Sequence, residues 1–81
     1  MLVEYKKDFL KQISKIKDLT FKEKIKKQVE KIVENPEIGK PMRYERKETR
    51  ELYLAPYRLA YAYIQKEDKL IFLEIYHKDK Q

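Results

Sequence analysis

The sequence predicts an α+β domain in which a helical hairpin covers one face of a mainly antiparallel, four-stranded sheet. Apolar residues recur at helical spacing through the first half of the 81-residue chain, and they alternate or run continuously in the second half. Pro36 separates the two patterns. A chain of this length buries only about 60% of the surface that it exposes when unfolded, so we expect residues 1–81 to form a single domain.

The first half of the chain predicts one short strand and two helices. Residues 2–5 alternate in part and favour a strand. Residues 8–19 form an amphipathic helix, because its apolar positions share one face: Phe9, Leu10, Ile13 and Ile16. A second helix is expected to begin near Thr20, since Thr20 and Glu23 have the spacing of a capping box. It ends by Asn35, because a following proline disfavours helical geometry.

The second half predicts a three-stranded meander after an exposed connection. Residues 36–48 are rich in proline and charge, which is typical of a loop. Residues 51–55 and 57–64 read as strands, and residues 65–69 as a hairpin turn. Residues 70–76 are almost continuously apolar, and such runs belong to strands that are covered on much of both faces. We therefore expect the last strand to lie inside the sheet.

Composition limits the classes of function. The formal charge of +6, on a chain that is 42% hydrophobic, predicts a folded domain attracted to polyanions such as nucleic acid, an anionic membrane or an acidic protein. The absence of cysteine excludes a disulfide framework, a zinc ribbon and a thiol nucleophile. No run of about 20 apolar residues predicts a membrane span, and residues 1–4 lack the order of a secretory signal. We expect a cytoplasmic protein without a membrane partner.

One arginine on the strand 57–64 is a candidate for phosphate binding. Alternation places Arg58 on the face away from the helices, beside the small residues Ala60 and Ala62. A guanidinium presents a planar fork of donors that fits phosphate and can stabilise the charge of a phosphoryl transition state. The alternative is that Arg58 pairs with Glu51 or Glu74 on a solvated sheet face.

The single histidine is a candidate for proton transfer. His77 follows the last apolar strand, between Tyr76 and Lys78, and an imidazole exchanges protons near neutral pH. The alternative is a surface histidine near the end of the chain. One histidine and no cysteine make a poor set of metal ligands, so we expect no metal and no cofactor.

A cluster of cations leads into the meander. Such a cluster can follow a phosphate backbone, with Tyr44 and Tyr53 available to stack on bases. Tyr57, Tyr61 and Tyr63 alternate on the helix-facing side, so core packing explains them better than base stacking. The candidate RNA-binding residues are Lys40, Arg43, Arg46, Lys47 and Arg50.

The sequence resembles the RelE/ParE superfamily of type II toxins over nearly its whole length. The resemblance rests on the order of elements, on Gly39-Lys40-Pro41, on the run from Arg50 to Tyr61 and on the closing Ile75-Tyr76-His77-Lys78. It implies a RelE-like toxin domain that acts as a ribosome-dependent, metal-free endoribonuclease. Such a toxin enters the ribosomal A site, cleaves mRNA to inhibit translation, and is held inactive by a cognate antitoxin.

The resemblance also implies roles for individual residues. Arg58 matches the strand arginine that neutralises the developing phosphate charge, and His77 matches a near-terminal histidine that transfers protons. This mechanism requires Arg58 and His77 to lie near each other on the open sheet face. Some members carry a glutamate after the Lys-Pro pair and a terminal tyrosine, where this chain has Met42 and Lys78. Glu45 could then act as base, with Tyr76 or Lys78 contributing.

Two other functions fit the same resemblance. The ParE branch keeps the fold, lacks the nuclease and inhibits DNA gyrase. The other alternative is a degenerate binding module without activity. The sequence leaves the antitoxin, the codon preference and the oligomeric state open.

Overall fold

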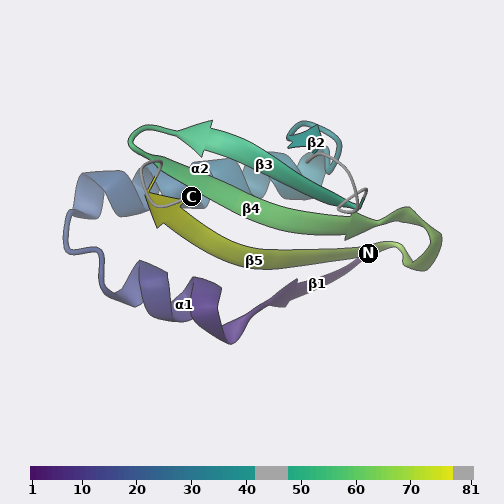
Figure 1. Ribbon diagram of the computed structural model, residues 1–81, viewed down its shortest axis with the longest axis horizontal. Coiled ribbons are helices and arrows are strands. Elements are labelled where there is room, and N and C mark those ends of the chain that lie inside the picture. The colour runs from purple at the N-terminus through teal and green to yellow at the C-terminus, as the bar shows by residue number, and fades with distance from the viewer. Residues whose placement is uncertain (42–47, 78–81) are drawn as a thin grey trace.

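The computed structural model describes residues 1–41 and 48–77 of the chain. Figure 1 shows α2 crossing behind the sheet and α1 lying next to β5. Within the described residues the elements are β1 (Leu2–Tyr5), α1 (Lys7–Ser14), α2 (Leu19–Glu34), β2 (Lys40–Pro41), β3 (Thr49–Leu54), β4 (Tyr57–Ile64), a short 3₁₀ turn (Gln65–Glu67) and β5 (Lys69–His77).

The sheet is mixed and, over the described residues, has the strand order β1-β5-β4-β3-β2. β1 is parallel to β5, and the other pairs are antiparallel. The α+β class and the two helices are confirmed, but the count of four strands was wrong. Lys40 and Pro41 pair with Glu51 and Arg50 as an edge strand inside the predicted connection. Two residues are too few to show alternation, and proline is tolerated at a sheet edge.

The helical hairpin differs from the prediction in its turn. α1 ends at Ser14, so the following residues form a longer connection than expected. Asp18 caps α2, because its carboxylate accepts hydrogen bonds from the amides of Thr20 and Phe21 at 2.9 and 3.2 Å. The predicted cap at Thr20 was therefore wrong. The end of α2 before Pro36 is confirmed, with Asn35 as the capping residue.

The core lies between the helices and one face of the sheet. The alternation predicted along β4 is confirmed, because Leu59 and Tyr61 are fully buried while Tyr57 and Tyr63 pack against the same cluster. The buried cluster consists of Phe9, Ile25, Ile32, Leu59, Tyr61, Leu70, Phe72 and Ile75. We call the opposite surface of β3, β4 and β5 the open face. Ala60 and Ala62 of β4 are buried on this face, and the side chain of Arg58 beside them is 29% exposed.

A buried tyrosine anchors the segment that leads into β2. The Tyr61 hydroxyl donates to the carbonyl of Pro36 at 2.7 Å and accepts from the amide of Gly39 at 2.8 Å. A Cβ on Gly39 would lie 2.5 Å from that hydroxyl, so the close approach requires glycine. The Arg50 guanidinium donates to the carbonyls of Glu37 and Gly39. These bonds hold β2 against β3.

Candidate functional site

A β-bulge decides which side chains of β5 reach the open face. Tyr61 pairs with Phe72, but the next residue of β4, Ala60, pairs with Glu74, which leaves Leu73 as an extra residue. Phe72 and Ile75 both face the core as a result. The alternation after the bulge is therefore inverted, and the last residues of β5 exchange faces. Bulges of this kind often re-aim side chains near functional sites.

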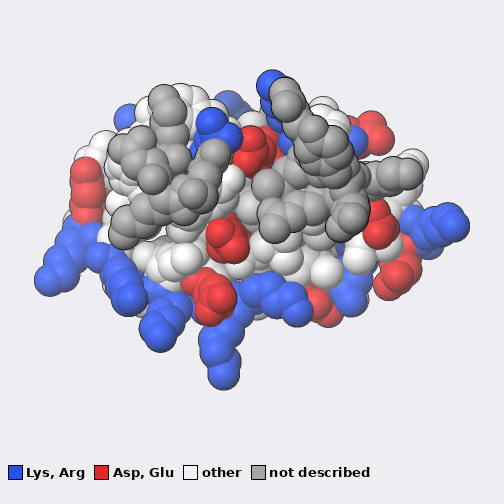
Figure 2. Space-filling view, in the orientation of Figure 1, with Lys and Arg blue, Asp and Glu red and all other residues white. Residues whose placement is uncertain are grey.

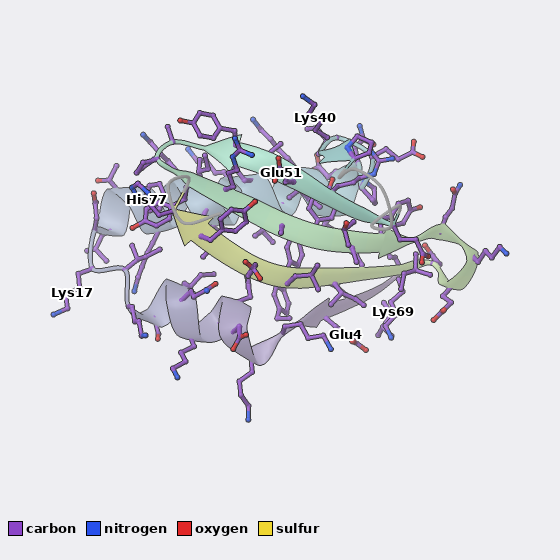
Figure 3. The ribbon with its side chains drawn as sticks, in the orientation of Figure 1. Glu4, Lys17, Lys40, Glu51, Lys69 and His77 are labelled. Carbon is purple, nitrogen blue, oxygen red and sulfur yellow. The ribbon has the colours of Figure 1, made fainter. Side chains whose placement is uncertain are left out.

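Three polar side chains meet on the open face. Arg58 Nη1 donates to Glu51 Oε1 at 2.9 Å, and the Tyr76 hydroxyl donates to Glu51 Oε2 at 2.8 Å. Arg58 pairs with Tyr76 across β4 and β5, and Glu51 lies on β3 two residues from the partner of Arg58. We call Glu51, Arg58 and Tyr76 the open-face cluster. Figure 3 shows Glu51 above the face of the sheet that is turned to the viewer.

The cluster is half-buried, which strengthens its interactions. The side chains of Arg58 and Glu51 are 29% and 21% exposed, so their charges are partly removed from water. The ion pair uses only Nη1 of the guanidinium, and Arg58 Nε is buried without a hydrogen-bond partner among the described residues. A guanidinium with donors left over can change partners when an anion arrives.

Tyr76 is held in its protonated form. Burial raises its pKa above the ordinary value of 10.0, and the hydrogen bond and the negative charge of Glu51 raise the pKa further, against a lowering influence of Arg58. The phenol is therefore neutral and a hydrogen-bond donor at physiological pH. A carboxylate, a guanidinium and a phenol within hydrogen-bond distance can together accept a proton, bind an oxyanion and donate a proton.

His77 lies on the other side of the sheet. It pairs with Tyr57 across β4 and β5, and their rings are 5.5 Å apart in an edge-on contact. Tyr57 in turn contacts Phe21 of α2, with ring centroids 5.2 Å apart. The expectation that Arg58 and His77 share the open face was therefore wrong. The bulge is the physical reason, because it places Tyr76 beside Arg58 and turns His77 toward the helices.

The predicted cationic cluster is only partly described. Lys40 is exposed on the edge strand β2, whereas Arg50 is bound to backbone carbonyls near Gly39. The remaining predicted cations, and the possible base Glu45, lie outside the described residues: Arg43, Arg46, Lys47 and Lys78. Tyr53 is exposed on β3 directly opposite Arg58, and its base-stacking role stays a prediction.

Most of the positive charge of the described residues lies in the two helices and the short segments that flank them. Residues 6–34 hold ten lysines against five carboxylates. Figure 2 shows carboxylates near the middle of the open face and lysines along its lower border, on the side of α1. Among the described residues, the cations that a polyanion could meet on this view therefore lie mainly at the rim. Glu51, which sequence reasoning named only as a partner for Arg58, is the carboxylate at the centre of the cluster.

The part of the chain that the structure describes offers neither a metal-binding cluster nor a membrane-spanning helix. Within residues 1–41 and 48–77, no group of three or more His, Cys, Asp or Glu side chains could hold a metal ion. No helix in the same ranges is long and apolar enough to cross a membrane.

Comparison with known proteins gives a family and a fold. A family model described as the ParE toxin of type II toxin-antitoxin system, parDE, matches residues 3–81. No curated protein matches the sequence. A chain of the intact Escherichia coli RelBE toxin-antitoxin complex is 20% identical, with 94% of each chain covered and a TM-score of 0.78.

Two further solved structures have the same fold. A chain of the RelBE2 toxin-antitoxin complex from Mycobacterium tuberculosis is 19% identical, with 95% of this chain and 96% of that chain covered and a TM-score of 0.79. The YoeB/ParE toxin from Agrobacterium tumefaciens is 14% identical, with 95% and 98% covered and a TM-score of 0.80. At such low identities the likeness concerns the fold alone.

Proposed function

The chain belongs to the ParE toxin family of type II toxin-antitoxin systems, within the RelE/ParE superfamily, and from this premise we propose that it cleaves mRNA on the ribosome. The observation that supports this best is the open-face cluster, in which Glu51 accepts hydrogen bonds from both Arg58 and Tyr76. The cluster contains the groups that metal-free RNA cleavage needs: a base, an oxyanion stabiliser and an acid.

Each residue of the cluster has one step in the proposed reaction. Glu51 accepts the proton of a ribose 2′-hydroxyl, and the 2′-oxygen then attacks the adjacent phosphorus. The bond between phosphorus and the 5′-oxygen breaks, which leaves a 2′,3′-cyclic phosphate. Tyr76 donates its phenolic proton to the departing 5′-oxygen, and Arg58 stabilises the charge on the phosphorane. Positioned proton transfer contributes about 10² to 10⁴ in rate for such a group.

The resting cluster must rearrange when RNA binds. Arg58 and Tyr76 both bind Glu51 in the free protein, so the carboxylate is not yet available as a base. A phosphate between the strands would take the guanidinium and the phenol away from Glu51. The same event would free Glu51 for the 2′-hydroxyl, so that RNA binding assembles the active state.

A cognate antitoxin is part of the proposal. Two of the structurally similar chains come from toxin-antitoxin complexes, RelBE of E. coli and RelBE2 of M. tuberculosis. We propose that this chain is likewise held inactive by a partner protein encoded with it. The test is whether coexpression of the neighbouring gene removes toxicity and yields a complex that survives gel filtration.

The cleavage assay compares three variants with the wild-type protein. Labelled mRNA in a translating extract is treated with each protein, and the cut positions are read by primer extension. Arg58→Ala, Glu51→Gln and Tyr76→Phe are each expected to lower cleavage within A-site codons by at least about 100-fold. Lys69→Gln is the matched control, because it removes a different ion pair of the sheet, the 3.4 Å contact with Glu4. Full cleavage by Arg58→Ala would contradict the proposed role of the guanidinium.

Inhibition of DNA gyrase is the second candidate function. It is favoured by the placement of His77 and Arg58 on opposite faces of the sheet, and by the pairing of the Arg58 charge with Glu51. A toxin of this type would stop DNA supercoiling by purified gyrase and leave mRNA intact. Running both assays on one protein preparation separates the two functions.

A further inference from the structure

A cavity lies on the helix side of the sheet, at the end of the sheet where β4 begins and β5 finishes, beside the turn between β3 and β4. Its volume is about 600 Å³, within the range of about 300 to 1,000 Å³ that is typical of small-ligand sites. α1 supplies Gln12 to its wall, the connection between the helices supplies Lys15 and Lys17, and β5 supplies His77. Of the open-face cluster, only Tyr76 also lines this cavity.

Three aromatic rings form one wall of the cavity. Phe21 and Tyr57 have ring centroids 5.2 Å apart, and Tyr57 and His77 have centroids 5.5 Å apart, with planes inclined at 39° and 76°. None of the three is fully buried, so ring surface remains available to a ligand. Aromatic surfaces of this kind accept a planar base by stacking, whatever its sequence.

The mouth of the cavity carries cations. Lys15 and Lys17 are both exposed, and Figure 3 shows Lys17 extending into solvent from the connection between the helices. Asp18 also lines the cavity, but its carboxylate is bound by two amides at the start of α2. The rim therefore suits a phosphate more than a cation.

The cavity and the open-face cluster meet at one residue. Tyr76 lines the cavity, and its hydroxyl binds Glu51 on the open face. Tyr57 and Arg58 are consecutive residues of β4, with the first at the cavity and the second in the cluster. A single strand of nucleic acid that passes around this end of the sheet can thus place a phosphate on one face and a neighbouring base on the other.

We infer that this cavity is a nucleotide-binding pocket that takes the base next to the cleaved phosphate. The base stacks on the aromatic wall, and its own phosphate binds Lys15 and Lys17. The inference rests on the proposed function, because it assigns a place to the substrate of the open-face cluster. It also gives His77 a binding role instead of the proton-transfer role that the sequence predicted.

Binding is measured with probes that cannot be cleaved. A fluorescein-labelled 2′-O-methyl hexanucleotide lacks the attacking hydroxyl and reports affinity by anisotropy. Adenosine 5′-monophosphate reports occupancy through the NMR shifts of the His77 ring. We expect His77→Ala to weaken hexanucleotide binding about tenfold. For the double variant Lys15→Gln/Lys17→Gln, the affinity is measured at several salt concentrations. The slope of log affinity against log salt concentration should be shallower by about one to two, because two phosphate-binding cations are lost.

The control and the mRNA cleavage assay separate the possible outcomes. Lys26→Gln/Lys27→Gln removes two exposed lysines of α2 that do not line the cavity, and it should leave the hexanucleotide affinity within about twofold. Unchanged binding by His77→Ala, together with unshifted His77 resonances, would overturn the inference, and intact mRNA cleavage in the same samples would leave the proposed function standing. The inference would also be overturned if the His77 resonances moved on addition of an antitoxin peptide but not on addition of adenosine 5′-monophosphate.

Discussion

Replacement of Glu51 by glutamine separates the catalytic role of its carboxylate from its structural role. Glutamine keeps the shape of the side chain but has one oxygen, so it can accept from Arg58 or from Tyr76 and not from both at full strength. The two side chains of the ion pair are 21% and 29% exposed, so the lost charge-assisted bond is partly shielded from water. We expect a loss of about 1 to 2 kcal/mol in the free energy of unfolding.

The same substitution should affect cleavage far more than stability. Loss of a positioned base costs about 10² to 10⁴ in rate, which corresponds to at least about 2.7 kcal/mol at the transition state. A loss of 1 to 2 kcal/mol in stability lowers the melting temperature of a domain of this size by roughly 4 to 16 °C. The mRNA cleavage assay is therefore run well below the melting temperature of the variant, where both proteins are folded.

A control and a spectroscopic readout complete this test. Glu74→Gln removes an exposed carboxylate opposite Ala60 on the same face and should leave cleavage unchanged. The pKa of Tyr76 should fall in Glu51→Gln, because the charge and the hydrogen bond of Glu51 both raise it. Wild-type cleavage rates in Glu51→Gln, with the expected fall in both pKa and stability, would refute the assignment of Glu51 as the base.

Three further predictions concern stability. Tyr61→Phe removes the hydroxyl that binds the carbonyl of Pro36 and the amide of Gly39, so we expect urea denaturation to show a loss of about 2 to 3 kcal/mol; a loss under about 0.5 kcal/mol would contradict the anchoring role. Gly39→Ala should destabilise the protein in both the wild-type and the Tyr61→Phe background, because a Cβ would lie 2.5 Å from the Tyr61 hydroxyl and also 2.8 and 2.9 Å from the ring atoms Cε1 and Cζ, which phenylalanine keeps; an unchanged stability in both backgrounds would disprove the close approach. The raised pKa of Tyr76 contributes stability below pH 10.0, which is lost as the pH rises through the folded-state pKa, so Tyr76→Phe should lose stability less steeply above pH 10.0; equal slopes in pH-dependent unfolding would argue against it.

The sequence predicted the layers of the fold because its periodicities are strong. The alternation from Tyr57 to Tyr63 assigned the faces of β4 correctly, and Pro36 marked the end of α2 correctly. The cap of α2 was misassigned because Asp18 and Thr20 are both good capping residues and only the first is in position. The edge strand β2 was missed because two residues carry no period.

Only part of the candidate site was named from the sequence, and its geometry was not predicted. Arg58 and Tyr76 were both named from the sequence, and the pairing of Arg58 with Glu51 was one of the two readings offered for it. The bulge in β5 was missed because residues 70–76 are almost all apolar. In such a run, a shift in the alternation between the two faces of the sheet leaves no visible mark in the sequence. The sequence does hold one signal of the bulge, the pair Phe72 and Glu74. In a regular strand these two residues would share one face, and a buried phenylalanine and an exposed carboxylate do not belong on the same face.

The charge distribution also could not be predicted from the sequence. Charge density along the chain drew attention to residues 40–50, but Arg50 binds backbone carbonyls, and lysines that are spread through residues 6–34 gather on the helical layer. Residues at helical spacing look dispersed in the sequence and become neighbours only in the folded protein.

The most direct test of the central claim is primer extension on mRNA from a translating extract treated with wild-type protein and with Arg58→Ala. The open-face cluster predicts cuts within codons at the A site that disappear with Arg58→Ala while the control Lys69→Gln keeps them. Intact mRNA in the presence of folded wild-type protein and active ribosomes would contradict the ribonuclease mechanism, and loss of supercoiling in the parallel gyrase assay would then establish the second candidate function.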